Sequence, residues 1–271
     1  MKRSAFTLTE LVVVISIVAI LVAIVLPMLS SSRERAKTVL CSSNIKQITV
    51  GLFMYDSQNQ TLPFSFGKTI TALPPGGYSG FKQYDRIGWW WFNFIEGFYK
   101  RSDARNTVIQ CPSKYLTDSK FKNNILCGNY GVNRSICKSS DDRQAHREEF
   151  IGKPLSSTEI PKPGETLLVA DSGYAMISWW HVTDTLPPPA ALNKNIIEDT
   201  AYIPGLKINN NRKNLSLLPC QEQDAIDGRH PNKTVNVGFA DGHISRTKAE
   251  DLFVEKTDDG YKNKIPLWVP K

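Results

Sequence analysis

Several patterns that mark enzymes and metal-binding domains are missing from this sequence. It contains no G-x-S-x-G, H-E-x-x-H or P-loop pattern, which argues against the common hydrolases, zinc peptidases and nucleotide-binding enzymes. It also lacks a C-x2-C spacing, which argues against a structural zinc site built on such a pair. A second long apolar run is absent as well, so at most one membrane span is expected.

The net charge of +7 is not concentrated in any block of five like charges. Lys2 and Arg3 precede the longest apolar run, and Arg33, Arg35 and Lys37 follow it. Basic residues beside a membrane segment face anionic lipid headgroups. Elsewhere basic and acidic residues alternate, which is typical of a solvated surface. We therefore expect a lipid bilayer as partner and no nucleic acid.

One segment is long and apolar enough to cross a bilayer. Within residues 11–29 only Ser16 and Pro27 fall outside the hydrophobic set. A helix over residues 6–29 would be about 36 Å long at roughly 1.5 Å per residue, more than a hydrocarbon core of about 30 Å. The run is not followed by an A-x-A cleavage site of the secretory type, so we do not expect it to be removed.

A short basic leader, residues 1–5, precedes Phe6-Thr-Leu-Thr-Glu10, which opens the apolar run. With these features, the first 58 residues resemble the prepilin family. The resemblance implies that a prepilin peptidase cuts between Ala5 and Phe6 and N-methylates the new Phe6 amine. It also implies an assembly role for Glu10, whose carboxylate would meet the N-terminal amine of a neighbouring subunit. A charge in the apolar run costs about 2.5 to 3.5 kcal/mol at mid-helix and less near an end, so Glu10 either has such a partner or lies at the headgroup level of an uncleaved anchor.

The helix, predicted over residues 6–58, should continue beyond the membrane. Ala36, Leu40, Ile48 and Leu52 recur at three- and four-residue steps, which predicts an amphipathic half packed on a domain. Pro27 should kink this helix or end its first half.

The remaining residues, 59–271, change to short β-type runs broken by Gly and Pro. The expected strands are 107–110, 166–170, 234–239 and 244–246. Residues 185–219 are expected to form a long surface excursion. The predicted fold class is α+β: a long N-terminal transmembrane helix packed on an antiparallel β-sheet head, pilin-like.

The aromatic segment Trp89–Phe94 allows two interpretations. The favoured one is a core block against the sheet. The alternative is a stacking platform for sugars that Trp179 and Trp180 could join.

Near the C-terminus, apolar residues alternate from Val235 to Phe239 and Asp241-Gly242 supplies a turn. Residues 234–246 should therefore form a β-hairpin. Ten residues separate His230 from Asp241, one more than in the H-X9-DG element that accompanies prepilin leaders, which this segment resembles. The resemblance makes His230, Asp241 and Gly242 a structural turn motif.

His230 could also belong to a metal site. His230, Asp241 and His243 are acceptable zinc ligands, and Asp171, at the end of a predicted strand, could be a fourth. The alternative is a hydrogen-bonded turn fixed by His230 and Asp241. We favour the turn, because no H-x3-H spacing or glutamate base is present, and we predict no cofactor.

Five cysteines in a chain expected to cross a membrane favour disulfides. Cys41 falls on the predicted helix, which leaves a pool of four: Cys111, Cys127, Cys137 and Cys220. Four cysteines allow three pairings, and the sequence does not choose among them.

The favoured function is that of a structural, non-enzymatic subunit of a type IV pilus-like or type II secretion pseudopilus filament. The resemblance implies three partners: a prepilin peptidase, other pilin or pseudopilin subunits and an inner-membrane assembly platform. It also implies a single-pass protein of the bacterial inner membrane, with its head in the periplasm or in a surface filament. The alternative is a membrane-tethered glycan-binding module or hydrolase outside the cytoplasm.

Overall fold

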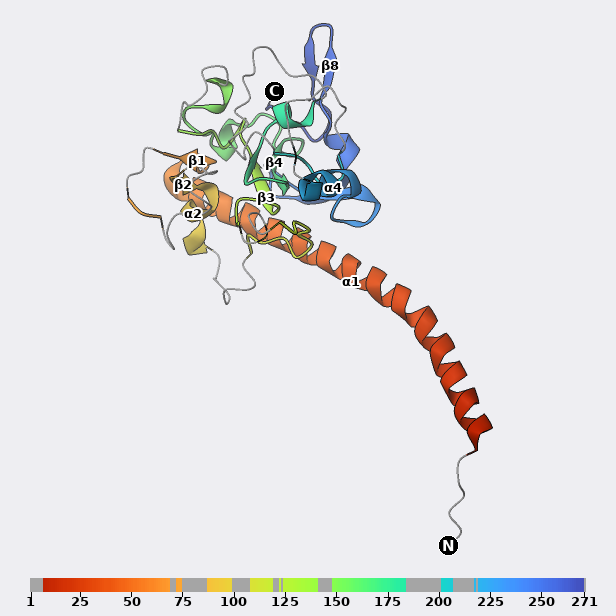
Figure 1. Ribbon diagram of the computed structural model, residues 1–271. Coiled ribbons are helices and arrows are strands. Elements are labelled where there is room, and N and C mark those ends of the chain that lie inside the picture. The colour runs from red at the N-terminus through yellow and green to blue at the C-terminus, as the bar shows by residue number, and fades with distance from the viewer. Residues whose placement is uncertain are drawn as a thin grey trace.

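The computed structural model shows a single long helix that carries a head at its C-terminal half (Figure 1). Of the 271 residues, the structure describes residues 7–68, 72–74, 87–98, 108–118, 122, 124–140, 148–183, 201–206, 217 and 219–270. The predicted α+β class, a long apolar helix on a β-sheet head, is confirmed.

Helix α1, Leu8–Asn59, has 52 residues and is about 78 Å long at roughly 1.5 Å per residue. It begins at a capping box. The Thr7 amide donates to Glu10 Oε2 at 2.8 Å, and the Glu10 amide donates to Thr7 Oγ1 at 3.3 Å. The helix ends at Gln60, which has a φ of 56° and whose amide donates to the Asp56 carbonyl.

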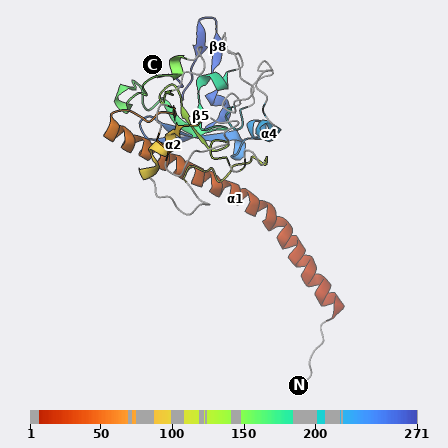
Figure 2. The same ribbon diagram turned by 60° about the vertical axis from the view of Figure 1, so that its left-hand side comes forward.

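Proline at position 27 does not end the helix. The α-helical conformation continues on both sides of Pro27, and Figures 1 and 2 show α1 curving through its exposed half. A proline removes one backbone hydrogen bond, while the remaining bonds of the neighbouring turns are kept. The apolar half and the half that carries the head are therefore one continuous element.

A five-stranded sheet forms the centre of the head, in the order β5-β3-β4-β6-β7. Its strands are β3 Tyr130–Asn133, β4 Leu167–Asp171, β5 Met176–Ile177, β6 Thr234–Phe239 and β7 Ile244–Lys248. Neighbours are antiparallel except β3 and β5, which are parallel. The predicted antiparallel sheet is thus correct apart from its short edge strand.

Smaller elements surround this sheet. Two separate hairpin-like pairs join β1 Phe66–Gly67 to β2 Trp89–Trp90 and β8 Glu255–Thr257 to β9 Gly260–Lys262. Among the residues that the structure describes, two further α-helices have described bounds, α2 Trp91–Phe94 and α4 Pro219–Asp227. Short 3-10 helices are η1 Glu96–Phe98, η2 Glu148–Phe150, η3 Ser157–Glu159, η4 Trp179–Val182, η6 Pro231–Lys233 and η7 Ala249–Leu252.

The C-terminal half of α1 packs across β6 and also contacts β4 and β7. Its buried residues are Thr38, Cys41, Ile45, Ile48, Thr49, Gly51, Leu52 and Asp56. The expected face was partly wrong, because Ala36 and Leu40 are exposed. The true face contains small and polar side chains, so counting apolar residues alone placed the face incorrectly.

Strands β4, β6 and β7 were predicted, and the hairpin of β6 and β7 pairs from Thr234 with Lys248 to Gly238 with Ile244. The strand expected at 107–110 was wrong: residues 108–110 form a turn and a bend, and residue 107 lies outside the described residues. Strand β3 was missed because all four of its residues are buried, which leaves no alternation to detect.

Part of the expected surface excursion is instead packed on the head. Ala201, Tyr202 and Ile203 are buried, and the Tyr202 hydroxyl donates to Asp224 Oδ2 at 2.7 Å. Residues 184–200 and 207–216 lie outside the described residues. The end of the expected excursion, at Pro219, is already the first turn of α4.

The aromatic segment is a core block, as favoured. Trp90 and Trp91 are 0 and 1 % exposed, and the Trp91 indole donates to the Ala175 carbonyl at 2.7 Å. Trp180 is also buried, whereas Trp179 packs on Tyr261. The sugar platform is therefore wrong for Trp90, Trp91 and Trp180, whose rings a sugar could not reach.

Candidate assembly helix and a buried side-chain cluster

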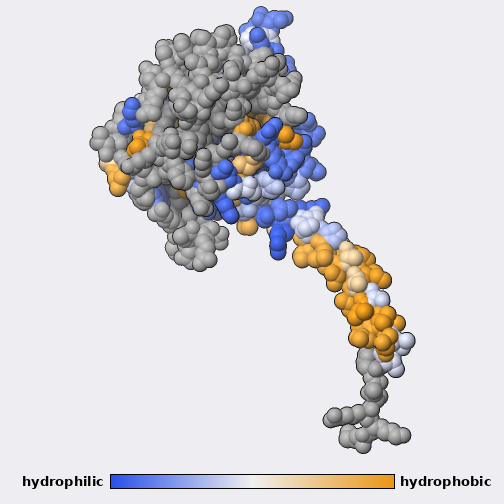
Figure 3. Space-filling view, in the orientation of Figure 1, coloured by the Kyte–Doolittle hydropathy of each residue, from blue (hydrophilic) through white to orange (hydrophobic). Residues whose placement is uncertain are grey.

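The first half of α1 is apolar on every side and unpartnered within the chain. Every Leu, Ile, Val and Met side chain from Leu8 to Leu29 is between 47 and 78 % exposed. Figure 3 shows this half as a nearly continuous orange surface beyond the head. By length and composition α1 is able to cross a membrane. A helix that is apolar all round belongs in lipid or among other helices.

Glu10 lies in the first turn of this apolar half. Its Oε2 accepts from the Thr7 amide at 2.8 Å and from the Thr7 hydroxyl at 2.7 Å. Both donors are neutral, so they satisfy lone pairs without neutralising the charge. The structure gives Glu10 no cationic partner among the residues it describes. The predicted cleavage-site residues, Ala5 and Phe6, lie outside the described residues.

A basic segment separates the apolar half from the head. Arg33 and Arg35 are exposed, and Lys37 pairs with Glu34 at 2.7 Å. In Figure 3 the orange surface gives way to blue before the helix reaches the head. This change places the boundary between an apolar and an aqueous surrounding immediately before the first buried residue, Thr38.

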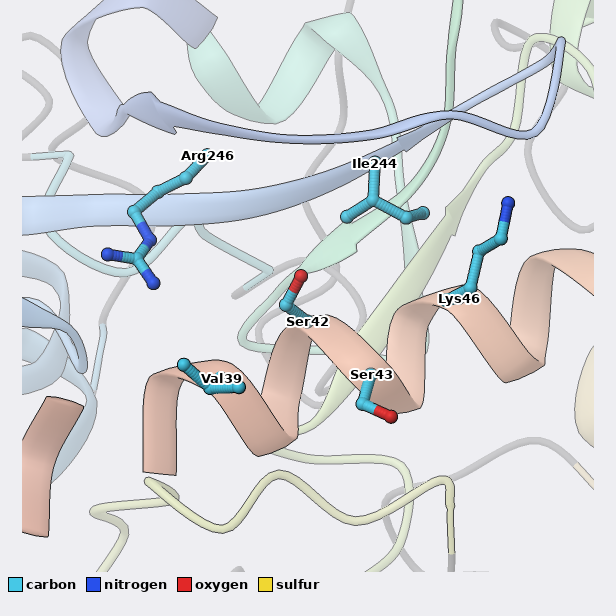
Figure 4. A pocket seen from close by; sticks show the side chains of 6 residues that line it. All are labelled: Val39, Ser42, Ser43, Lys46, Ile244 and Arg246. Atoms are coloured by element: carbon cyan, nitrogen blue, oxygen red, sulfur yellow. The ribbon is translucent and has the colours of Figure 1, made fainter. Parts of the chain in front are cut away.

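An open pocket lies between α1 and β7. Figure 4 shows that four of its side chains come from the helix and two from the strand. The lining residues are Val39, Ser42, Ser43, Lys46, Ile244 and Arg246. Lys46 also donates to the Gly242 carbonyl at 2.7 Å, which ties the hairpin turn to the helix. The lining offers two cations and no carboxylate or imidazole, so it lacks a general base.

The hairpin turn keeps Asp241 and His243 together and away from His230. Asp241 Oδ1 accepts from the His243 amide at 2.9 Å and lies 2.6 Å from His243 Nδ1. Burial raises the pKa of Asp241, but these hydrogen bonds and the charge of His243 together outweigh it and bring that pKa below its ordinary value. Gly242 has a φ of +92°, as a turn glycine should.

His230 lies instead in the interior, against α1. Its Nε2 is 3.1 Å from Asp171 Oδ2, and its Nδ1 is 3.1 Å from Thr38 Oγ1. The expected pairing of His230 with Asp241 is therefore not formed. Of the four residues considered as metal ligands, the structure brings together His230 and Asp171 and leaves Asp241 and His243 at the surface.

Two cysteines complete this interior group. Cys41 Sγ lies 3.0 Å from Cys111 Sγ, and all five cysteines of the chain are free. One ligand atom from each of Cys41, Cys111, Asp171 and His230 lies within 4.8 Å of the others. We call these four residues the Cys-Asp-His cluster. Cys41, which was left out of the predicted cysteine pool because it falls on the helix, faces the head and lies beside Cys111, a member of that pool. The spacing of Cys41 to the buried Ile45 and Ile48 would have indicated this position.

Charge in the cluster is distributed unevenly. Burial lowers the pKa of His230, but the neighbouring Asp171 carboxylate and Cys41 outweigh it and raise that pKa to about 9. A hydrogen bond from Cys111 lowers the pKa of the Cys41 thiol below its ordinary value, despite burial. Burial raises the pKa of Cys111 well above its ordinary value. The cluster therefore favours a thiolate at Cys41 beside a cationic His230.

Comparison with known proteins agrees with the exposed helix. Residues 1–26 match the family model described as "Prokaryotic N-terminal methylation motif". These residues are a prepilin-type segment. Over 62 residues the chain is 39% identical to "Type II secretion system core protein G" of Pseudomonas aeruginosa. That stretch covers 23% of this chain and 44% of that protein, so the chain spans less than half the length of this relative. No solved structure matches the chain.

The prepilin-like character predicted from the leader and helix is thus confirmed, and it fits a membrane-anchored protein. The resemblance of the C-terminal segment to the H-X9-DG element stays a prediction. Elsewhere in the chain, one serine–histidine pair is too deeply buried to act on a substrate. Ser178 Oγ lies 3.0 Å from His181 Nδ1, but both residues are completely buried and could not meet a substrate.

Proposed function

We propose that this protein is a structural, non-enzymatic subunit of a type IV pilus-like or type II secretion pseudopilus filament. A prepilin peptidase would process it between Ala5 and Phe6, and an inner-membrane platform would assemble it with other pilin or pseudopilin subunits. It would reside in the bacterial inner membrane as a single-pass protein, with its head in the periplasm or in a surface filament. The prepilin-type match over residues 1–26 supports this assignment.

The observation that carries the proposal is the bare apolar half of α1. Burying a Val, Leu or Ile side chain is worth about 1.5 to 3 kcal/mol relative to exposure in water, and 16 large aliphatic side chains from Leu8 to Leu29 are exposed. Either lipid or the helices of neighbouring subunits would cover them. The head covers none of them, so this half remains available for assembly.

Glu10 distinguishes an assembling helix from a plain anchor. A carboxylate among these apolar side chains costs about 2.5 to 3.5 kcal/mol at mid-bilayer and less near the surface. Thr7 provides hydrogen bonds to it but no positive charge. The processed amine of a neighbouring Phe6 would offset that cost when two subunits stagger, and this gives Glu10 a role that a simple anchor does not require.

The test replaces Glu10 with Val and, separately, with Gln. Gln keeps an acceptor for the Thr7 donors but has no charge, so it separates loss of the capping box from loss of the charge. Both variants should insert, be processed and fold. Both should lower cross-linking between α1 helices in membranes at least about tenfold, which corresponds to about 1.4 kcal/mol.

The control is Glu34→Gln, which removes a carboxylate from the same helix outside the apolar half. It should leave cross-linking unchanged. If Glu10→Val and Glu10→Gln cross-link as well as the unmodified protein, the filament-subunit proposal is wrong and α1 is only an anchor.

A further inference from the structure

We propose that the Cys-Asp-His cluster binds one zinc ion that fastens the assembly helix to the head. Its four residues come from four separate segments: α1, the turn-rich loop at residues 108–118, the end of β4 and the residues before β6. Two thiolates, an imidazole and a carboxylate are all ligand types that zinc accepts. The four side chains are between 0 and 4 % exposed, so the site is closed to solvent.

The spacing of the donor atoms suits tetrahedral zinc. With Zn–S bonds of about 2.3 Å and Zn–N or Zn–O bonds of about 2.0 to 2.2 Å, ligand atoms lie about 3.3 to 3.8 Å apart. The two sulfur atoms are 3.0 Å apart, His230 Nε2 reaches the Asp171 carboxylate at 3.1 Å from Oδ2, and one ligand atom of each residue lies within 4.8 Å of the others. Movements of less than 1 Å, within the range of side-chain rotation, would complete the coordination.

The hydrogen bonds of His230 direct its Nε2 toward the other members of the cluster. The Thr38 hydroxyl donates to the Glu34 carbonyl at 2.8 Å, so at 3.1 Å from His230 Nδ1 it is an acceptor. Nδ1 therefore keeps its proton, and Nε2, which lies 3.1 Å from Asp171 Oδ2 and 3.2 Å from Asn236 Nδ2, is the nitrogen that would bind the ion on losing its own proton. A ligating histidine is commonly oriented through its second ring nitrogen in this way.

Asp171 supplies a second, independent indication. Its Oδ2 accepts from the Asn236 amide at 2.8 Å and from Asn236 Nδ2 at 3.0 Å. Its Oδ1 is buried and has no hydrogen-bond partner among the residues that the structure describes. An unsatisfied oxygen on a completely buried carboxylate is costly. A bound cation would satisfy it, whereas a proton on His230 would serve only Oδ2.

Four protein ligands without an open position are typical of structural zinc rather than catalytic zinc. The ion would connect residue 41 of the assembly helix to residues 111, 171 and 230 of the head. Because the unfolded chain holds no preformed site, the binding free energy would add directly to the stability of this attachment.

A disulfide between Cys41 and Cys111 is the competing state. The sulfurs would have to close from 3.0 Å to about 2.05 Å. A disulfide would account for two of the four side chains and would leave Asp171 Oδ1 without a partner. Zinc accounts for all four.

The decisive experiment measures metal and thiols on the full chain. The protein is purified from membranes in detergent without reductant, dialysed against metal-free buffer, and analysed by mass spectrometry of its elements. Free thiols are counted after denaturation with chelator. We expect about one zinc per chain and five reactive thiols, matching the five free cysteines. Three thiols without zinc would establish the disulfide and overturn the proposal, as would five thiols without zinc.

Variants locate the ion. Cys111→Ser and Asp171→Asn should each lower the zinc content, whereas Cys137→Ser, which alters an equally buried cysteine outside the cluster, should retain it. Should the cluster variants fail to fold, cobalt(II) loading of the unmodified protein replaces them. Thiolate-to-cobalt charge-transfer absorption is expected, and its absence, or full zinc retention by Cys111→Ser, would refute the site.

Discussion

Gly238 of β6 lies directly against α1, and it offers a sharp test of how the helix packs on the sheet. A Cβ atom at this position would lie 2.7 Å from Thr49 Oγ1, 2.9 Å from Val169 Cγ1 and 3.0 Å from Ile45 Cγ2. All three neighbours are completely buried, and Thr49 is held by a hydrogen bond to the Ile45 carbonyl at 2.8 Å. None of them can move aside without disturbing the packing of helix on sheet.

We expect Gly238→Ala to destabilise the head by about 1 to 2 kcal/mol. Adding a methyl group to a full core costs typically about 1 to 3 kcal/mol. Alanine also restricts the unfolded chain, which offsets about 0.4 to 1 kcal/mol of that cost. Adding Thr49→Ala removes the nearest clashing atom, so the double variant should be more stable than the sum of the two single effects predicts.

Urea unfolding in mild detergent, followed by tryptophan fluorescence, measures this effect. All six tryptophans follow residue 88, so the signal reports on the head and not on α1. Gly97→Ala is the matched control, because a Cβ there meets nothing within 4 Å. If Gly238→Ala and Gly97→Ala have the same free energy of unfolding, the helix does not sit on β6 as described.

Three further changes test other parts of the molecule. Ala5→Leu should accumulate as uncleaved precursor on a gel while Ala5→Gly is processed normally, and equal processing of both would remove the proposed cleavage site. Gly242→Val should cost about 1 to 3 kcal/mol in the same urea assay, because φ is +92° and Phe53 lies 3.2 Å from the added Cβ; an unchanged midpoint would contradict this account of the turn. Asp224→Asn should cost about 3 to 5 kcal/mol, because it leaves the completely buried Arg229 without the carboxylate it contacts at 2.7 Å; a loss below about 1 kcal/mol would show that water reaches the pair.

The sequence predicted those elements whose signal is local. The apolar run and the helical spacing beyond it predicted α1 as one long helix, and alternation predicted β6 before its Asp-Gly turn. The fully buried β3 gave no alternation, and the two residues of β5 are too few to form a pattern. The apolar side chains Val108 and Ile109 suggested a strand, but their conformation is a turn.

The Cys-Asp-His cluster was beyond sequence reasoning for a different reason. Its members are separated by roughly 60 to 70 residues along the chain, so no spacing rule connects them. Asp171 was considered because it ends a predicted strand, and His230 because it precedes the hairpin. Which side of α1 faces the head decides whether Cys41 lies near these residues and Cys111. The spacing of apolar residues along α1 predicted that side incorrectly.

That rotation is set by polar contacts at both ends of the buried half of α1. At one end Thr38 contacts His230 at 3.1 Å, and at the other Asp56 accepts from the Ser157 amide at 3.1 Å. Apolar packing tolerates small slips, whereas each broken buried hydrogen bond costs about 1 to 3 kcal/mol. A turn of α1 by one residue, about 100°, would break both contacts.

Because α1 runs without a break from its apolar half into the head, the side of the helix on which Glu10 lies fixes the direction in which the head faces. Any filament built through Glu10 would therefore present the same face of every head.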